Sequence, residues 1–167
     1  MDSIDRQITA LLGKDGRMPN REIARRIGVS EGTVRKRLGR LIERGVLRVT
    51  AQVNVDSLPE TYLAFVGVKI DGRRLNGCAE AVEKLPSVLT TMIVTGRYDL
   101  FAVVLAHSHR TLVDFVTNQL SHVPGVKDSE TYVVLRAFDQ WISAGKLEAL
   151  LDETDDNENN DVTGVNR

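Results

Sequence analysis

The chain has 167 residues, of which 42% are hydrophobic and 27% charged, as in ordinary globular proteins of one or two small domains. No apolar run reaches the roughly 18 residues of a membrane-spanning helix, and the acidic N-terminus does not resemble a signal peptide. We therefore expect a cytoplasmic protein with no membrane partner. Cys78 is the only cysteine, which excludes an intrachain disulfide and a cysteine-based metal cluster, and its place on an apolar stripe predicts a small buried side chain.

The formal net charge of −1 conceals a strong segregation of charge along the chain. Residues 1–50 contain 12 Lys and Arg against 6 Asp and Glu, whereas residues 152–167 contain one Arg against 6 Asp and Glu. A basic N-terminal segment on a nearly neutral remainder is typical of a protein that binds a polyanion through one face. The acidic segment 152–167 has almost no large apolar residues and is predicted to be a disordered tail.

The first predicted helix covers residues 2–14, where apolar residues recur at helical spacing. Residues 20–45 then predict two helices joined by a tight turn. Gly28 suits the left-handed end of the first of these helices, and Ser30 suits the N-cap of the second. The second helix carries an apolar stripe, a basic outer face and a glycine stop at Gly45. A short helix, a glycine-containing turn and a basic amphipathic helix predict a helix-turn-helix whose second helix enters a DNA major groove.

Residues 46–49 and 51–55 are rich in β-branched residues and predict a two-stranded wing beside the second helix, which would add contacts to the phosphate backbone. Residues near the start of that helix would reach base edges, and Arg40, Arg44 and Arg48 would meet phosphates. Arg37 fits either DNA or a structural bond within the domain. The candidate DNA-contacting residues are Ser30, Glu31, Thr33, Arg35, Lys36, Arg37, Arg40, Arg44 and Arg48. The alternative interpretation is an ordinary helical pair with a solvated basic face.

A domain of residues 1–55 is expected to end at a linker over residues 56–60, because Pro59 interrupts regular pairing there. From residue 61 to residue 138, apolar strands and amphipathic helices alternate in the order β-α-β-β-α-β, the ferredoxin-like arrangement. The two central strands lie so close in sequence that they must be antiparallel neighbours. A terminal helix is predicted over residues 139–151. The fold class is therefore α+β, with a winged helix-turn-helix followed by a ferredoxin-like domain.

The predicted sheet has one face covered by two helices and one open face. Leu, Phe, Val and Thr residues fall on that open face by the alternation of the strands. An apolar open face requires a partner, so we expect a homodimer in which the two sheets pack face to face.

The chain resembles the Lrp/AsnC, or feast/famine, family of transcription regulators over roughly residues 2–138. In the N-terminal part, the resemblance rests on residues 4–8, 14–17, 23–30 and 43–47. In the C-terminal part, it rests on residues 94–99, which resemble the family's Gly-x-Tyr-Asp turn, and on residues 124–126 with 130–135. No single motif is very specific, but their order along the chain is.

The resemblance implies dimers that assemble further into tetramers or octamers, and a small effector, usually an amino acid, held near the Gly-x-Tyr-Asp turn. The effector residues it implies are Gly96, Arg97, Tyr98, Asp99 and Thr131. A glycine lets backbone N–H groups approach a carboxylate, and Asp99 can accept an ammonium group. Arg97 departs from the acidic or small polar residue common there. The alternative is that the turn is only a hairpin and that Asp99 only caps it.

The leading functional hypothesis is a sequence-specific, DNA-binding transcriptional regulator that is modulated by an effector and is not an enzyme. A second hypothesis is an effector-independent DNA-architectural protein. A third is an enzyme on the same architecture, such as a haem-pathway decarboxylase. The sequence shows no catalytic set and no phosphate-binding loop, and His107 and His109 are expected to lie at an exposed helix start. We expect no cofactor and no metal site.

Overall fold

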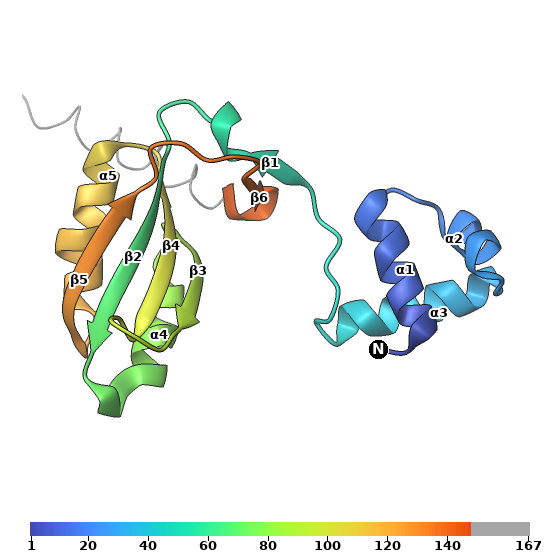
Figure 1. Cartoon of the computed structure of the whole chain (residues 1–167), viewed down its shortest axis with the longest axis horizontal. Coiled ribbons are helices and arrows are strands. Elements are labelled where there is room, and N and C mark those ends of the chain that lie inside the picture. The colour runs from blue at the N-terminus through green and yellow to red at the C-terminus, as the bar shows by residue number, and fades with distance from the viewer. Residues whose placement is uncertain (148–167) are drawn as a thin grey trace, which may run out of the picture. The chain divides into compact units, whose positions relative to one another are not determined.

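The computed structural model describes residues 1–147, and the chain divides into two compact units. We call the unit from Met1 to Ala51 the head and the unit that begins at Gln52 the body. Figure 1 shows a helical head and a body built around a main sheet. The division falls between Ala51 and Gln52, a few residues before the predicted boundary at residue 55.

The head consists of α1 (Ser3–Lys14), α2 (Asn20–Ile27) and α3 (Glu31–Glu43). Asp2 caps α1 through a reciprocal pair of hydrogen bonds with Asp5, since each carboxylate accepts from the other residue's backbone N–H. The three helices bury one small apolar cluster, as the helical periodicities predicted. Its buried members are Ile8, Leu12, Met18, Ile23, Ala24 and Val34.

The body contains a four-stranded antiparallel sheet in the order β3-β4-β2-β5. The strands are β2 (Tyr62–Ile70), β3 (Val88–Ile93), β4 (Leu100–Ala106) and β5 (Val126–Val133). The helices α4 (Leu75–Glu83) and α5 (His109–Asp114) complete the predicted β-α-β-β-α-β order. After α5 the chain continues in a π-helical segment, η3 (Phe115–Gln119), and a 3-10 turn, η4 (Leu120–His122).

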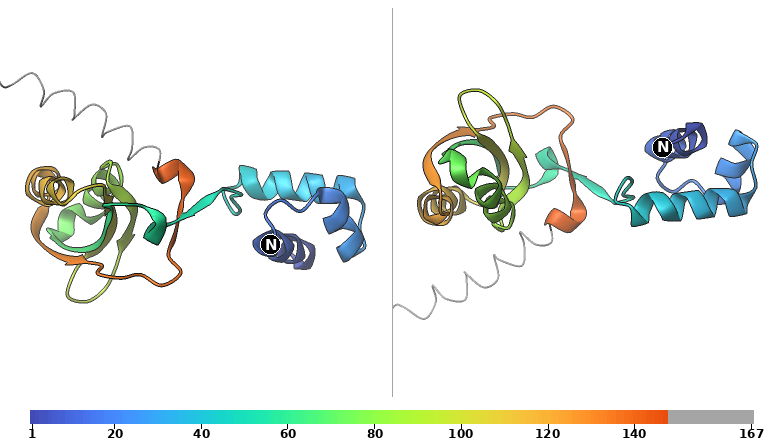
Figure 2. Two further views of the ribbon diagram at one scale, coloured as in Figure 1. Left: turned by 90° about the horizontal axis from the view of Figure 1, so that it is seen from above. Right: turned by 90° about the horizontal axis from the view of Figure 1, so that it is seen from below.

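One face of this sheet packs against the helices, which the end-on views of Figure 2 display as a layer beside the strands. The core between the two layers contains alternate residues of β2 and β4, together with Cys78 and Val82 from α4 and Phe115 near α5. Cys78 is almost completely buried, as predicted, and burial raises the pKa of its thiol.

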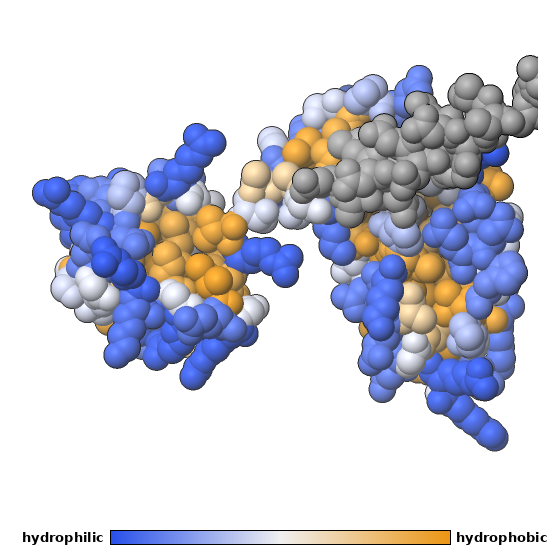
Figure 3. All heavy atoms as spheres, turned by 180° about the vertical axis from the view of Figure 1, so that it is seen from behind, coloured by the Kyte–Doolittle hydropathy of each residue, from blue (hydrophilic) through white to orange (hydrophobic). Residues whose placement is uncertain are grey.

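The predicted wing is not formed. Within the described residues, 46–51 contain no strand, and β1 (Gln52–Asn54) pairs with β6 (Trp141–Ser143), an antiparallel strand of the body. The physical reason is competition for the same backbone groups, since the ladder to β6 uses those that a wing would need. Val46 and Val49 remain about half exposed, and Figure 3 shows an apolar area on the head among charged side chains.

The predicted linker at residues 56–60 and the predicted terminal helix also require correction. Val55 begins the 3-10 turn η1 (Val55–Ser57) and is buried with Leu63, Leu105 and Ile142, so this segment belongs to the body. Residues 141–143 are a strand, and helix begins only at residue 144. Burial of Ile142 against the sheet favours the strand over the predicted helix. Residues 148–151 and the predicted tail 152–167 lie outside the described residues.

Within residues 1–147, the β1–β6 ribbon covers one end of the other face of the sheet, where it packs over Leu63 and Leu105. Farther along the same face, large apolar residues stay exposed. Phe65 and Tyr132 are register partners on β2 and β5, and Met92 and Phe101 are partners on β3 and β4. Phe65, Met92 and Tyr132 are each more than 40% exposed, which agrees with the predicted apolar open face.

Candidate functional site

The turn between α2 and α3 has the geometry of a helix-turn-helix. Gly28 ends α2 in the left-handed conformation with φ of 73°, which a glycine adopts without strain. Ser30 caps α3, because its Oγ accepts a hydrogen bond of 3.1 Å from the backbone N–H of Thr33. Val34 and Leu41 anchor α3 to the head, so its opposite face is solvent-exposed. The predicted pair of helices and both predicted caps are confirmed.

The candidate DNA-contacting residues do not all have free side chains. Ser30 and Thr33 are engaged with each other at the cap, with 2.8 Å between their hydroxyl oxygens. Glu31, Arg35, Lys36, Arg40, Arg44 and Arg48 are exposed, whereas Arg37 is half-buried. The helix cap therefore explains why Ser30 and Thr33 stand at these positions, so neither residue requires a DNA contact to explain it.

Arg37 takes the structural role that the sequence left open. Its Nη1 donates to Asp2 and, over 2.9 Å, to Oδ1 of Asp5, a residue that is only 3% exposed. Arg40 reaches the same Asp5 carboxylate at 3.4 Å. The backbone N–H of Asp5 and the Arg37 guanidinium lower the pKa of Asp2 to about 2, and Arg37 also lowers the pKa of Asp5. These ion pairs tie α3 to the start of α1.

Two further carboxylates hold arginines on the head. Glu22 binds both Arg25 and Arg26 at 2.7 Å, and these bonds lower the pKa of Glu22 to about 2. Glu31 binds Arg35 at 2.8 Å on the exposed face of α3. By contrast, Lys36, Arg44 and Arg48 lie within 4 Å of no carboxylate in the described part of the chain. Among the basic candidate DNA-contacting residues, these three therefore carry a charge that no carboxylate of residues 1–147 neutralises.

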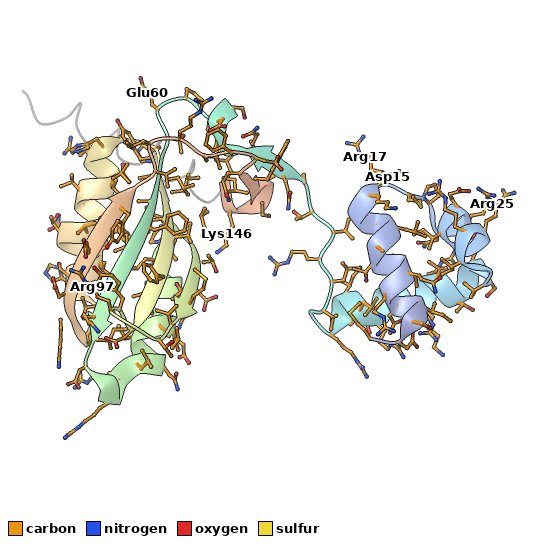
Figure 4. The ribbon with its side chains drawn as sticks, viewed as in Figure 1. Asp15, Arg17, Arg25, Glu60, Arg97 and Lys146 are labelled. Carbon is orange, nitrogen blue, oxygen red and sulfur yellow. The ribbon has the colours of Figure 1, made fainter. Side chains whose placement is uncertain are left out.

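The second candidate site is the turn between β3 and β4. Gly96 has φ of 125°, a conformation suited to glycine. Arg97 projects from the turn at the side of the sheet, as its label in Figure 4 shows, and its side chain is 77% exposed. Its guanidinium lies 3.2 Å from the Glu130 carboxylate and 5.4 Å from the centre of the Tyr98 ring. The turn therefore presents one exposed cation that already has an acidic neighbour.

Tyr98 closes over the sheet at Gly67. A Cβ atom added to Gly67 would lie 2.6 Å from the Tyr98 ring, so only glycine leaves room for this packing. The Tyr98 hydroxyl lies 3.3 Å from that of Tyr132, and the ring meets Phe101 edge-on. Tyr98 is thus a buried structural residue of the open face.

Asp99 and Thr131 are positioned differently from Arg97. The Asp99 carboxylate accepts a 2.9 Å hydrogen bond from the backbone N–H of Ile70, at the bulge that ends β2, and lies 3.7 Å from Lys69 Nζ. Thr131 pairs with Val66, a residue of the helix-covered core, so it faces away from Glu130 and Tyr132. The structure brings Gly96, Arg97 and Tyr98 together and does not bring Thr131 to them.

Two family models match the chain along most of its length. The model of the AsnC-type helix-turn-helix domain matches residues 1–42, and the model of the Lrp/AsnC ligand binding domain matches residues 63–140. An uncharacterized HTH-type transcriptional regulator of Pyrococcus abyssi is 36% identical over 84% of this chain and 89% of its own length. This chain belongs to the Lrp/AsnC family. It is therefore a member of a family of DNA-binding transcriptional regulators that carry a ligand-binding domain.

Other Lrp/AsnC proteins agree with this assignment. The HTH-type transcriptional regulator FL11 of Pyrococcus furiosus is 32% identical over 81% of this chain and 90% of its own length. The crystal structure of the Mycobacterium tuberculosis leucine response regulatory protein has a TM-score of 0.75 at 27% identity, covering 84% of this chain and 96% of that chain. A Neisseria meningitidis regulator solved in complex with L-Met has a TM-score of 0.70 at 26% identity, covering 86% and 95%.

The structure of this Lrp/AsnC chain also shows residues that sequence reasoning missed. Three carboxylates of the head that form ion pairs with its arginines were not among the predicted site residues. They belong to Asp2, Asp5 and Glu22. The spacing of Asp2 and Asp5 is that of a capping box and could have indicated the first pair.

Outside these sites, Ser108 caps α5 and His107 bonds Thr111, in line with the expected helix start. Among residues 1–147 no cluster of His, Cys, Asp and Glu could hold a metal, and no helix is suited to cross a bilayer.

Proposed function

We propose that this protein is a sequence-specific transcriptional regulator that binds double-stranded DNA through α3 and responds to an amino acid bound at the β3–β4 turn. It acts in the cytoplasm, together with the DNA. The observation that carries the DNA-binding half is the sorting of charge on α3. Asp5 retains Arg37 and Arg40 against α1, while Lys36 and Arg44 have no acidic partner among the described residues and keep their charge for DNA phosphates.

Support for the effector half comes from the β3–β4 turn. Arg97 is exposed and bound to Glu130 by one contact, so an incoming carboxylate can replace Glu130 as its partner. The Neisseria meningitidis relative was solved in complex with L-Met, and an amino acid such as L-Met carries the α-carboxylate that an arginine can bind. An amino acid is thus the effector class that we propose, with Arg97 as its carboxylate-binding residue.

The test measures binding of the full chain to the DNA upstream of its own gene by fluorescence anisotropy, from low to high salt and with each of the twenty amino acids. We expect binding well above that to competitor DNA and a change caused by one or a few amino acids. Arg97→Ala should abolish the amino-acid response and leave DNA binding intact. Arg73→Ala, which removes another exposed arginine of the body, should change neither. Equal binding to all DNA with no amino-acid response would instead support the DNA-architectural alternative.

The open face of the sheet supports assembly of the protein with itself. Phe65, Met92 and Tyr132 are exposed on this face, and a second copy can bury them face to face. Phe65→Asp should convert the dimer into monomers in light scattering coupled to gel filtration. The matched control is Val113→Asp, because Val113 is similarly exposed but lies on α5, on the other side of the sheet. Dissociation by both variants, or by neither, would contradict a dimer through the open face.

A further inference from the structure

The outer face of α3 contains two glycines that nothing in the head requires. Gly32 and Gly39 have ordinary negative φ, and an added Cβ would meet no heavy atom closer than 3.9 Å at either position. Glycine inside a helix is less stable than alanine, so both positions carry a cost in helix stability. The packing of the head does not explain that cost.

Helical geometry places both glycines on the line of α3 that faces away from the core. At 3.6 residues per turn, Gly32 and Gly39 point within about 20° of each other and about 180° from Leu41. Arg35 and Lys36 lie on either side of this line, one turn after Gly32 and one turn before Gly39. The solvent-facing line of α3 therefore has no side chain at its two glycine positions, and two basic side chains lie between them.

These two basic side chains differ in how they are held. Glu31 binds an Nη atom of Arg35 at 2.8 Å, which restricts the rotamers of Arg35, and no other described residue occupies the second edge of the guanidinium. Lys36 has no acidic partner among the described residues. A planar guanidinium that is already oriented is suited to bidentate hydrogen bonds with guanine O6 and N7, whereas a mobile ammonium acts as a point charge.

We propose that Arg35 is the guanine-reading residue of α3, that Glu31 is its positioning residue, and that Gly32 and Gly39 let the groove come close enough for this contact. The proposal rests on the proposed DNA-binding function and deepens it, because it assigns the recognised base. A side chain at Gly39 would separate the helix from the edges of the bases by the size of a methyl group.

The first experiment selects binding sites from a random duplex library of about 20 base pairs with the full chain and its variants. Wild type should enrich a motif with one fixed G·C pair. Arg35→Lys should lose the preference at that pair, by about 5- to 150-fold in relative affinity, and Glu31→Gln should weaken it at the same pair. Lys36→Ala should keep it. A general structural defect would lower the affinity for all DNA sequences and would not reduce the base preference at one particular position of the motif.

The outcomes separate this proposal from the function on which it rests. A wild-type motif that persists in Arg35→Lys would overturn the assignment of Arg35 and leave sequence-specific binding standing. A motif relaxed by Arg35→Lys but unaffected by Glu31→Gln would overturn the positioning role of Glu31. If wild type enriched no motif, the proposed sequence-specific function would fail, and this inference with it.

The second experiment tests the two glycines, whose replacement by alanine should have opposite effects on helix stability and on DNA affinity. Gly39→Ala and Gly32→Ala should raise the melting temperature of the helical signal and weaken binding to the selected site, by about tenfold for Gly39→Ala. Gly77→Ala is the matched control, because Gly77 is an open helical glycine of α4 in the body. It should stabilise the protein and leave DNA binding unchanged. Unchanged or tighter binding by Gly39→Ala would overturn the close-approach role of the glycines.

Discussion

The head and the body of this protein are stabilised in different ways. The head has a core of a few aliphatic side chains, and ion pairs from Asp2 and Asp5 to Arg37 connect its first and third helices. The body has a larger core between its sheet and its helices, centred on β2, β4 and Phe115. All eight aromatic residues of the chain lie in the body, and none lies in the head. Aromatic fluorescence therefore reports only on the body.

The two units also differ in their exposed surfaces, which are charged in the head and partly apolar in the body. In the head, carboxylates pair with selected arginines of α2 and α3, whereas Lys36, Arg44 and Arg48 have no acidic partner within residues 1–147. In the body, apolar residues fill one face of the sheet and continue onto the other, where Phe65 and Met92 remain exposed. A polyanion suits the first surface, and a second copy of the chain suits the second.

The largest expected effect is confined to the body. Phe115 is fully buried, so Phe115→Ala should destabilise the body by about 3–5 kcal/mol through lost burial and a cavity. Denaturant unfolding followed by aromatic fluorescence should show this loss. Hydrogen exchange in α1 to α3 should stay unchanged if the head folds independently. Equal loss of protection in both units would contradict the separation of the two cores.

A smaller loss is expected where the body accommodates a tyrosine on the open face. Gly67→Ala should destabilise the body by roughly 1–3 kcal/mol, because the new methyl group occupies the space of the Tyr98 ring. The measurement is again unfolding by fluorescence. Gly67→Ala combined with Tyr98→Ala should cost less than the two changes added together, since the clash is then absent. Full additivity would show that Tyr98 is not the residue that excludes a side chain at position 67.

Local patterns in the sequence predicted most of the fold. The stripe of α3, the turn at Gly28 and the strands on both sides of Gly96 depend on neighbours in sequence, so their periodicity and turn chemistry were sufficient. The β1–β6 ribbon could not be predicted in this way. Its strands have three residues each and lie at opposite ends of the body sequence, and residues 46–55 look equally suited to a local hairpin.

The candidate sites show the same limit. The sequence located the basic residues of α3, but it could not decide the role of Arg37, because its partner Asp5 lies two helices earlier in the chain. It also placed Thr131 with Arg97. Which face of β5 a residue occupies depends on its register with β2, and that register sends Thr131 to the helix-covered face and Glu130 to Arg97.

A pair of arginine variants sharpens the contrast within the head. Arg44→Ala should weaken binding to all DNA sequences about equally, by roughly tenfold near 0.1 M salt, and lower the salt slope by about one, because one phosphate contact is lost. Its melting temperature should hardly change. Arg37→Ala should instead lower the melting temperature of the helices, since the nearly buried Asp5 loses the nearer of its two guanidinium partners. Anisotropy titrations and circular dichroism measure the two effects. An exchange of these two phenotypes would contradict a structural role for Arg37 and a phosphate-binding role for Arg44.

The smallest effect is a pH dependence of the head. The pKa of Asp2 is lowered to about 2 in the folded head, below its ordinary value of 3.8, so its charge stabilises the head above about pH 4. This contribution should disappear as the pH falls from about 4 to 2. Asp2→Asn keeps an N-cap acceptor but cannot ionise, so wild type should be the more stable protein at pH 5 and should lose this advantage near pH 2. Helical circular dichroism during denaturation at each pH measures the difference. Glu43→Gln, at an exposed carboxylate of α3, should show no comparable change, and a wild-type advantage that persisted at pH 2 would mean that the charge of Asp2 is not its source.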